Sequence, residues 1–210
     1  AWQLAAIIAL AQDRTFLAAM KRGSFSRQVR RIREPFWLMC GYGQTGALLC
    51  DRLGHAGQRV VVLEKREQEI FELELHDNGL SVPALLADAR DAEVLMMAGL
   101  SHTQLAGVLA LTSDDATNLG IAAAARVLNP YVPVYCRSET PSVAESALAF
   151  GTDMLVNPFK VFTDELRLLL INPEAHTLFT RLTPTHGTGR LSERLCPEGQ
   201  WIICGYGRFG

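Results

Sequence analysis

Between Pro35 and Pro158, short apolar runs alternate with segments of helical spacing, and this alternation limits the folds open to the chain. Strands joined by helices of this length need crossover connections, which predict a parallel sheet covered by helices on both faces. We predict six strands, over Phe36–Cys40, Arg59–Leu63, Val82–Ala87, Ala106–Thr112, Val132–Cys136 and Met154–Val156. Helices are predicted over Gln44–His55, Arg66–His76, Asp91–Ala98, Asp115–Leu128 and Pro141–Phe150. The predicted fold class is α/β, a doubly wound, Rossmann-like parallel sheet of six strands.

A glycine-rich turn, Gly41-Tyr-Gly-Gln-Thr-Gly46, joins the first predicted strand to the first predicted helix. In the spacing G-x-G-x-x-G, the glycines allow a tight turn, the approach of a pyrophosphate and close packing of helix on strand. Glu64 ends the second strand, where a carboxylate can accept both ribose hydroxyls. Together these features predict a nucleotide site; a purely structural turn is the alternative. The carboxylate favours NAD over NADP, although Lys65 or Arg66 could turn inward and weaken that preference.

Two further strand ends carry polar residues. Asp88 follows the third predicted strand, and Thr112-Ser-Asp-Asp-Ala-Thr-Asn118 follows the fourth. Ligands of open α/β sheets bind at the carboxyl ends of strands, so both segments are expected beside the glycine turn. The Ser and Asp residues of the second segment could equally cap the next helix, because their side chains satisfy free amides at a helix N-terminus. The two roles are compatible, and both stay open.

The charge and the reactive side chains argue against several classes of protein. A formal net charge of −2 over 210 residues lacks the basic excess expected of a nucleic-acid-binding domain. The five cysteines form no C-x-x-C pair. With Cys40 and Cys204 inside apolar runs, they are expected to be buried thiols in a reducing compartment. The five histidines are scattered along the chain. We therefore predict no metal site and no catalytic residues.

The segments that flank the predicted domain over residues 35–158 differ in composition. Residues 1–34 begin with an apolar stretch, shorter than the ~20 residues that cross a bilayer, and continue with a basic cluster. This order is typical of the cytoplasmic flank of a membrane helix; an amphipathic helix with a solvated cationic face is the alternative. Residues 159–172 are predicted to form a helix with an apolar stripe, and residues 173–200 a connector with some local structure. Residues 201–210 repeat the first strand and glycine turn, which predicts a second, truncated copy of the domain.

An ordered set of motifs resembles those of RCK domains, the regulators of potassium conductance that are also called TrkA-N or KTN domains. The set comprises Gly41-Tyr-Gly-Gln-Thr-Gly46 with Glu64, Ala87-Asp-Ala89, Leu111-Thr-Ser-Asp-Asp-Ala-Thr-Asn118, Cys136-Arg137, Gly151-Thr-Asp153 and Val156-Asn-Pro158. The similarity covers residues 35–172, and the ordered set is more specific than any one motif. Ala87 departs from the glycine that is usual in the family, which bears on the local backbone turn. The repeated glycine turn resembles the tandem type of RCK protein.

The resemblance implies a nucleotide-sensing regulatory domain of a potassium channel or potassium uptake system. Family members bind NAD(H), ATP, ADP or AMP, and NAD(H) is the first candidate here. They form homodimers or larger rings that act on a potassium-conducting membrane subunit or a pore domain of the same chain, which implies a cytoplasmic location at the inner face of the cell membrane. Residues 159–172 resemble the crossover helix that exchanges between partners; a helix packed on its own sheet is the alternative. The residues implied in nucleotide binding are Gly41, Tyr42, Gly43, Gln44, Thr45, Gly46, Glu64, Lys65, Asp88, Ala89, Thr112, Ser113, Asp114, Asn118 and Arg137.

A nicotinamide-dependent dehydrogenase is the main alternative function. Such an enzyme needs a proton donor beside the nicotinamide and a region that binds the substrate. None of the four tyrosines has a lysine four residues later, as a short-chain dehydrogenase would, and a connector follows the sheet where a catalytic domain is expected. We therefore predict that the chain is not an enzyme. An interaction scaffold that has lost its ligand is the third class of function.

Overall fold

The computed structural model describes residues 13–75, 82–140 and 152–182, which fall into two units. The first unit runs to Val156 and holds a sheet with its helices, and the second begins at Asn157 and holds a pair of helices. Within the described residues, no helix is both long enough and apolar enough to cross a membrane.

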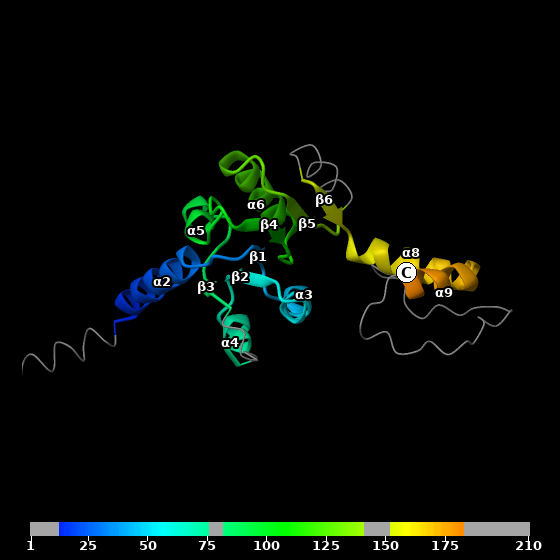
Figure 1. The fold of residues 1–210 in the computed structure, drawn as a ribbon, viewed down its shortest axis with the longest axis horizontal. Helices are drawn as coiled ribbons and strands as arrows, with labels where there is room; N and C mark the ends of the chain where they lie inside the picture. The colour runs from blue at the N-terminus through cyan, green and yellow to red at the C-terminus, as the bar shows by residue number, and fades with distance from the viewer. Residues whose placement is uncertain (1–12, 76–81, 141–151, 183–210) are drawn as a thin grey trace, which may run out of the picture. The chain divides into compact units, whose positions relative to one another are not determined.

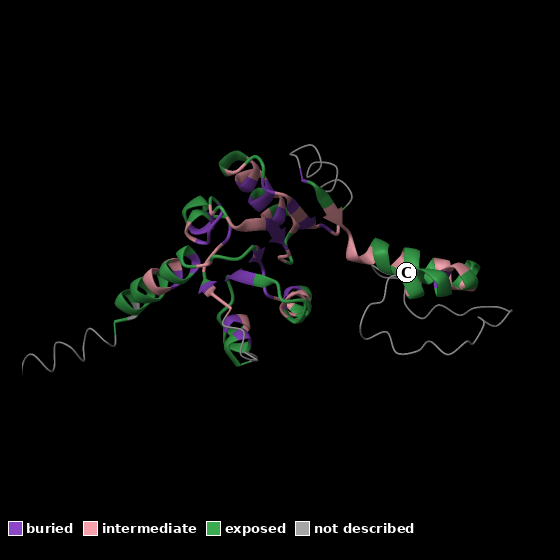
Figure 2. Cartoon of the chain, in the orientation of Figure 1, coloured by how far each residue is buried: buried purple, intermediate pink, exposed green. Residues whose placement is uncertain are grey.

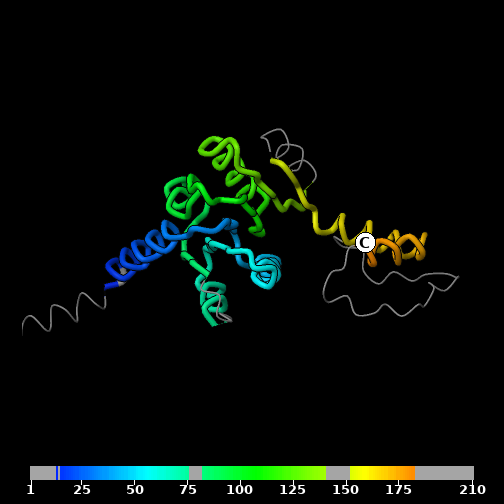
Figure 3. The backbone as a smooth tube through the Cα atoms, in the orientation of Figure 1, coloured from blue at the N-terminus to red at the C-terminus, as the bar shows by residue number. Residues whose placement is uncertain are grey.

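The sheet has six parallel strands in the order β3-β2-β1-β4-β5-β6 (Figure 1), which confirms the predicted fold class. They are β1 (Phe36–Cys40), β2 (Arg59–Glu64), β3 (Ala84–Leu86), β4 (Leu105–Ala110), β5 (Val134–Arg137) and β6 (Met154–Val156). The chain moves outward from β1 to β3 and then returns to the other side of β1, a path that Figure 3 follows. This reversal makes the carboxyl ends of β1 and β4 a switch point, where open α/β sheets bind ligands.

Two strands begin two residues later than the sequence predicts. The predicted starts were Val82 and Val132, but β3 and β5 begin only after Pro83 and Pro133. A proline has no N–H group to donate to the ladder, so it can precede a parallel strand but cannot pair fully within one. The carbonyl of each proline still accepts an amide hydrogen from the neighbouring strand, at 2.9 Å in both cases. The prolines therefore fix where regular pairing starts.

Helices cover both faces of the sheet. They are α2 (Arg14–Arg30), α3 (Gln44–His55), α4 (Glu67–Leu75), α5 (Ala92–Met97) and α6 (Asp115–Leu128). Successive residues of a strand point to opposite faces, so Leu38 and Cys40 pack in a core with α2, α5 and α6, whereas Met39 packs in a core with α3 and α4. The predicted helix over Pro141–Phe150 lies outside the described residues.

Helix α2 occupies the basic half of the predicted N-terminal linker. Asp13 caps it by accepting the amide hydrogens of Thr15 and Phe16. Phe25 and Val29, in its last two turns, are 3% and 1% exposed and belong to the larger core of the sheet unit. The end of α2 is thus fixed on the sheet by two apolar side chains that lie one helical turn apart.

The second unit consists of α8 (Pro158–Ile171) and α9 (Pro173–Leu182). Asn157 caps α8 by accepting the amide hydrogens of Phe159 and Lys160, and Pro158 takes the first helical position, where no amide hydrogen is needed. The predicted helix over residues 159–172 is therefore present. Helix α9 is an additional element, because it occupies the first part of the predicted connector over residues 173–200.

Candidate functional site

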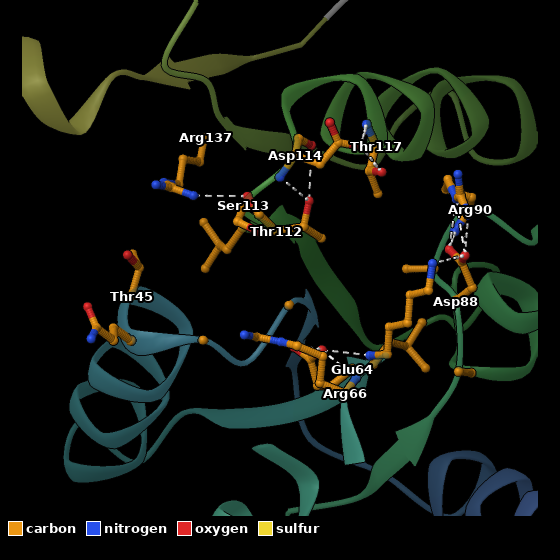
Figure 4. A pocket seen from close by; sticks show the side chains of 18 residues that line it. Thr45, Glu64, Arg66, Asp88, Arg90, Thr112, Ser113, Asp114, Thr117 and Arg137 are labelled. Carbon is orange, nitrogen blue, oxygen red and sulfur yellow. Dashed lines mark hydrogen bonds and ion pairs between the residues drawn. The ribbon is translucent and has the colours of Figure 1, made fainter. Parts of the chain in front are cut away.

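A pocket of about 410 Å³ opens at the carboxyl ends of the central strands, beside the start of α3 (Figure 4). The predicted residues that line it are Gly41, Gly43, Gln44, Thr45, Glu64, Lys65, Asp88, Ala89, Thr112, Ser113, Asp114 and Arg137. The other predicted residues, Tyr42, Gly46 and Asn118, do not line the pocket but support the segments that do. The topology therefore brings all five predicted segments of the chain to one cavity.

The glycine turn is built for close approach of backbone to backbone. Gly41 has φ +105°, a conformation that side chains disfavour, and a Cβ atom there would lie 2.8 Å from the amide nitrogen of Thr112. A Cβ on Gly46 would lie 2.3 Å from the carbonyl oxygen of Gly41. Gly43 differs from both, because a Cβ there would meet only the flexible end of Arg66, at 3.2 Å. The outer glycines are thus required by the fold, while Gly43 faces the pocket.

Helix α3 begins at this turn with no side chain bonded to its first amides, because its N-cap is Gly43. An uncapped helix start presents free N–H groups and the positive end of the helix dipole. Such an end suits a phosphate, which can accept several of these hydrogens at once. The start of α3 is therefore the part of the pocket best suited to an anionic ligand.

Glu64 holds the glycine turn and the end of β2 together. Its carboxylate accepts the amide hydrogen of Tyr42 at 2.6 Å, that of Lys65 at 2.7 Å and that of Arg66 at 2.8 Å. The side chain is only 6% exposed, yet Glu64 also lines the pocket. A carboxylate can accept about four hydrogen bonds, so one lone pair is left for a ligand hydroxyl. Tyr42 contributes its backbone here, while its side chain is buried in the core below α3.

The two cations after Glu64 take different directions. The Lys65 ammonium group lies 3.3 Å from a carboxylate oxygen of Asp88. The Arg66 guanidinium group lies beside Gly43, where it pairs with Glu69 at 2.7 Å. Arg66 is therefore the cation that reaches the glycine turn, and it stands within the same pocket as the free amides of α3.

A compact ion pair closes the side of the pocket near β3. The Arg90 guanidinium group donates to Oδ2 of Asp88 at 2.6 Å and to Oδ1 at 3.1 Å, and the Arg90 amide also donates to Asp88. These bonds from Arg90, together with Lys65, hold the pKa of the Asp88 carboxyl well below its usual range. Ala87 stands where the family usually has glycine, but no residue other than glycine has a positive φ in the described chain. The alanine therefore introduces no backbone strain.

The segment after β4 caps a helix and also lines the pocket. Strand β4 ends at Ala110, so Thr112 lies in the loop rather than in the predicted strand. Asp114 caps α6 by accepting the amide hydrogen of Thr117 at 3.0 Å, and it also lines the pocket. Asn118 is buried, and its side-chain amide is bonded at 2.9 Å to the amide nitrogen and the carbonyl oxygen of Thr112 and to the carbonyl oxygen of Arg137. Asn118 thus joins the ends of β4 and β5 and does not itself face the pocket.

Arg137 closes the pocket on the side of β5. Its guanidinium group donates to the carbonyl oxygen of Thr112 at 3.1 Å and pairs with Glu139. The Nε atom is buried and has no hydrogen-bond partner within the described part of the chain. Figure 4 places Arg137 across the pocket from Arg66 and Glu64. Two guanidinium groups therefore approach the cavity from opposite sides, and this arrangement suits a ligand with negative charge along its length.

The thiols near the site are not activated. Burial raises the pKa of Cys136 to about 11, and burial also raises the pKa of Cys40, so both thiols stay protonated at neutral pH. The expectation of a buried thiol is confirmed for Cys40, whereas Cys204 lies outside the described residues. Among residues 13–75, 82–140 and 152–182, no group of three or more His, Cys, Asp or Glu side chains is placed to hold a metal ion.

Five lining residues besides Arg66 are absent from the predicted site, namely Leu63, Ala87, Arg90, Leu111 and Thr117. Leu63 and Leu111 adjoin predicted site residues and could have been included on position alone. Arg90 follows Asp88 by two residues, a spacing that allows the side chain to fold back on the carboxylate. Thr117 lies in the first turn of α6, near its cap. Proximity to a strand end was thus the available signal in each case.

Comparisons with known proteins agree with this geometry. A family model described as the TrkA-N domain matches residues 37–158. Potassium channel protein 1 of Methanocaldococcus jannaschii is 26% identical over 147 residues, which are 70% of this chain and 43% of that protein. The chain spans less than half the length of the curated relatives it matches.

Solved structures share the fold. The TrkA-N domain of the inner membrane protein ybaL from Escherichia coli has a TM-score of 0.59 at 23% identity, over 64% of this chain and 96% of that chain. The GsuK channel bound to NAD has a TM-score of 0.55 at 17% identity, over 63% and 23% of the two chains. The AMP-bound form of the Kef CTD from Shewanella denitrificans has a TM-score of 0.51 at 17% identity, over 70% and 91%.

Proposed function

The chain belongs to the TrkA-N domain family, and we propose that it is the nucleotide-sensing regulatory domain of a potassium channel or potassium uptake system. The potassium channel protein among its relatives supports this assignment. In this proposal the domain binds a nucleotide without consuming it and transmits a conformational change to a potassium-conducting membrane domain.

The pocket supports an adenine nucleotide as the ligand, with NAD(H) the first candidate and ATP, ADP or AMP the others. The observation that carries the proposal is the uncapped start of α3, which lies in one cavity with the Glu64 carboxylate. The amides would hold phosphate, and Glu64 would accept a ribose hydroxyl. Solved proteins of similar fold hold NAD in one case and AMP in another, which supports both a dinucleotide and a mononucleotide.

Arg66 and Arg137 would bind the charged groups of the nucleotide from opposite sides. Arg66 stands beside Gly43 and can add a charge-assisted hydrogen bond to a phosphate held by α3. Arg137 lines the other side of the pocket and can bind an acceptor further along the ligand. Nucleotides that share the adenosine half but differ beyond it would then meet Arg137 and the Thr112 loop differently.

The assembly in this proposal is a homodimer or a larger ring. Its support is α8, where Val161 is 54% and Leu166 is 41% exposed, and α9, where Leu178 is 60% exposed. Several exposed apolar side chains on one pair of helices are more stable against a protein partner than in contact with water. We place the ring in the cytoplasm at the inner face of the cell membrane, where it would act on a pore domain of the same polypeptide or on a separate membrane subunit.

Isothermal titration of the chain with NADH, NAD, ATP, ADP and AMP tests the binding step. We expect heat from at least one of them, and no heat from any at high-micromolar concentration would contradict the proposal. An assay for steady oxidation of NADH with candidate substrates separates a sensor from a dehydrogenase, because a sensor leaves the nucleotide unchanged.

Potassium flux through the full-length parent protein, reconstituted in vesicles, tests the regulatory step. A ligand shifts a conformational equilibrium only by its difference in affinity for the two states. We therefore expect NADH and ATP to change the flux by different amounts. Flux that is indifferent to every nucleotide, in protein shown to bind one, would disprove the gating role.

A further inference from the structure

Charge is strongly segregated along the chain, and α2 carries the positive part. Between Arg14 and Arg33 the sequence has seven Lys or Arg residues and no Asp or Glu. This segment therefore carries +7, and since the whole chain has a formal net charge of −2, the remainder carries −9. The small net charge of the whole chain is therefore the sum of a cationic segment and an acidic remainder.

Six of the seven cations in this segment are exposed. Lys21, Arg22, Arg27, Arg30, Arg31 and Arg33 are all exposed. None of the six forms an ion pair with any other residue that the structure describes. Glu34, the nearest acidic residue in sequence, is paired with Arg59 at 2.5 Å. Around the pocket, by contrast, Lys65, Arg66 and Arg90 each have an acidic partner.

Exposed apolar side chains lie directly before the cations on the same helix. Phe16, Leu17 and Met20 are 38%, 42% and 57% exposed, and Lys21 and Arg22 follow them. Only the last two turns of α2 are buried on the sheet, so its first turns extend away from the core (Figure 2). An aromatic and two long aliphatic side chains beside a cluster of cations combine the two properties that bind a helix to an anionic lipid surface.

We propose that α2 and the residues up to Arg33 form a binding surface for anionic phospholipid headgroups, with Phe16, Leu17 and Met20 entering the boundary of the acyl chains. Nucleic acid would satisfy the cations but offers no apolar phase for these side chains, so a lipid surface accounts for both features. The inference deepens the membrane location in the proposed function. It does not depend on the nucleotide pocket, which lies at the carboxyl ends of the strands.

Sedimentation with vesicles tests the proposal on the whole chain. We expect the protein to sediment with vesicles that contain phosphatidylcholine and phosphatidylglycerol. With vesicles of pure phosphatidylcholine, the protein should remain in the supernatant. The triple variant R27Q/R30Q/R31Q should bind the anionic vesicles roughly 100-fold more weakly, because each cation near such a surface adds to the affinity. The matched control R52Q/R167Q/R181Q removes three exposed cations outside α2 and should bind as the wild type does.

A second pair of measurements identifies the partner. The variant F16S/M20S keeps every cation and should therefore still bind anionic vesicles. Its affinity should be about tenfold lower than that of the wild type, since apolar burial contributes to interfacial binding. Equal vesicle binding by R27Q/R30Q/R31Q and wild type would overturn the proposal. Tight binding of the protein to duplex DNA, together with no binding to either kind of vesicle, would also overturn the proposal. Vesicle binding in a protein that binds no nucleotide would support this inference while disproving the nucleotide-sensing function.

Discussion

Glu64 performs two tasks with one carboxylate, and its removal should affect both. It accepts three backbone amide hydrogens in a site that is almost closed to water, and it lines the pocket. Replacing Glu64 with Ala should lower the free energy of unfolding by ~1–3 kcal/mol, because buried amides lose their acceptor. Nucleotide affinity should fall by a similar ~1–3 kcal/mol through the lost bond to the ribose. Urea denaturation and calorimetric titration measure the two effects. An Ala variant with unchanged stability would show that the amides find another acceptor.

The glycines of the turn should separate folding from binding. A Cβ on Gly46 meets the carbonyl oxygen of Gly41, so Gly46→Ala should cost ~1–3 kcal/mol of stability, as overpacking does. A Cβ on residue 43 would meet only the flexible end of Arg66, so we expect Gly43→Val to leave the fold intact and to block the approach of phosphate. Gly120→Ala, in open space on α6, is the control and should not destabilise. Thermal unfolding and nucleotide titration of all three variants provide the measurement. A strongly destabilised Gly43→Val variant would argue against this division.

Arg66 should contribute affinity that depends on phosphate charge. Replacing it with Gln removes a cation beside the start of α3, so nucleotide affinity should fall by ~1–3 kcal/mol, the usual worth of a bond to a charged group. Arg52 lies on α3 away from the pocket lining, so Arg52→Gln provides a control with the same change in charge. Titration with ATP and AMP should show the larger loss for ATP, which carries more phosphate. Equal affinity of Arg66→Gln and wild type for both nucleotides would remove Arg66 from the site.

At the residue scale, spacing predicted the parts of the site that depend on the backbone. The turn from Gly41 to Gly46 and the strand-end position of Glu64 follow from the order of strand, turn and helix. Spacing could not decide which of Lys65 and Arg66 reaches the glycine turn, because neighbouring loop side chains are directed by partners distant in sequence. Asp88 is such a partner, since it pairs with Lys65. Asn118 joins two strand ends, a role that only the sheet order makes visible, and its predicted contact with a ligand stays a prediction.

At the scale of elements, α8 should hold the proposed dimer together. Its exposed apolar side chains include Leu166, whereas Arg167 lies on the polar side of the same helix by the periodicity of 3.6 residues. Leu166→Asp should weaken the dimer, because it places a charge in the apolar contact. Arg167→Asp introduces the same residue one position away and should leave the dimer intact. Light scattering over a range of concentrations distinguishes these outcomes, and a wild-type mass of 23.1 kDa at high concentration would disprove the dimer.

The type of an element was predictable where a regular hydrophobic pattern extends over many residues. The positions of the element ends were less predictable. The helices over Gln44–His55 and Asp115–Leu128 have the predicted bounds, because a glycine turn or an acidic cap marks their starts. The strands after Pro83 and Pro133 start late, since an apolar run does not show which of its amides can pair. Helix α9 was read as part of a connector because Pro and Thr are frequent there; Pro173 instead begins a helix, where its missing N–H costs nothing.

For the whole molecule, bound nucleotide should stabilise the unit that contains the pocket. A ligand that binds only the folded state at 100 times its dissociation constant adds about 2.7 kcal/mol to the free energy of unfolding. For a domain of this size that corresponds to a rise in the unfolding midpoint of roughly 5–10 °C. Scanning fluorimetry with increasing NADH or ATP gives the measurement. The Glu64→Ala variant should show a smaller rise at equal ligand, and an identical rise in both proteins would place the binding site elsewhere.

The unpaired cations of α2 extend from one end of the sheet unit, and this asymmetry of charge has a kinetic consequence. A dipolar protein that diffuses toward a negatively charged surface is turned before it touches, with its cationic end leading. Encounters then begin in the productive orientation, so the association rate should exceed that of a randomly oriented chain and should fall as salt screens the field. The dissociation rate, which reflects short-range contacts, should respond less to salt. The unpaired arginines of α2 would thus determine the rate at which the domain associates with the membrane and its orientation at the first contact.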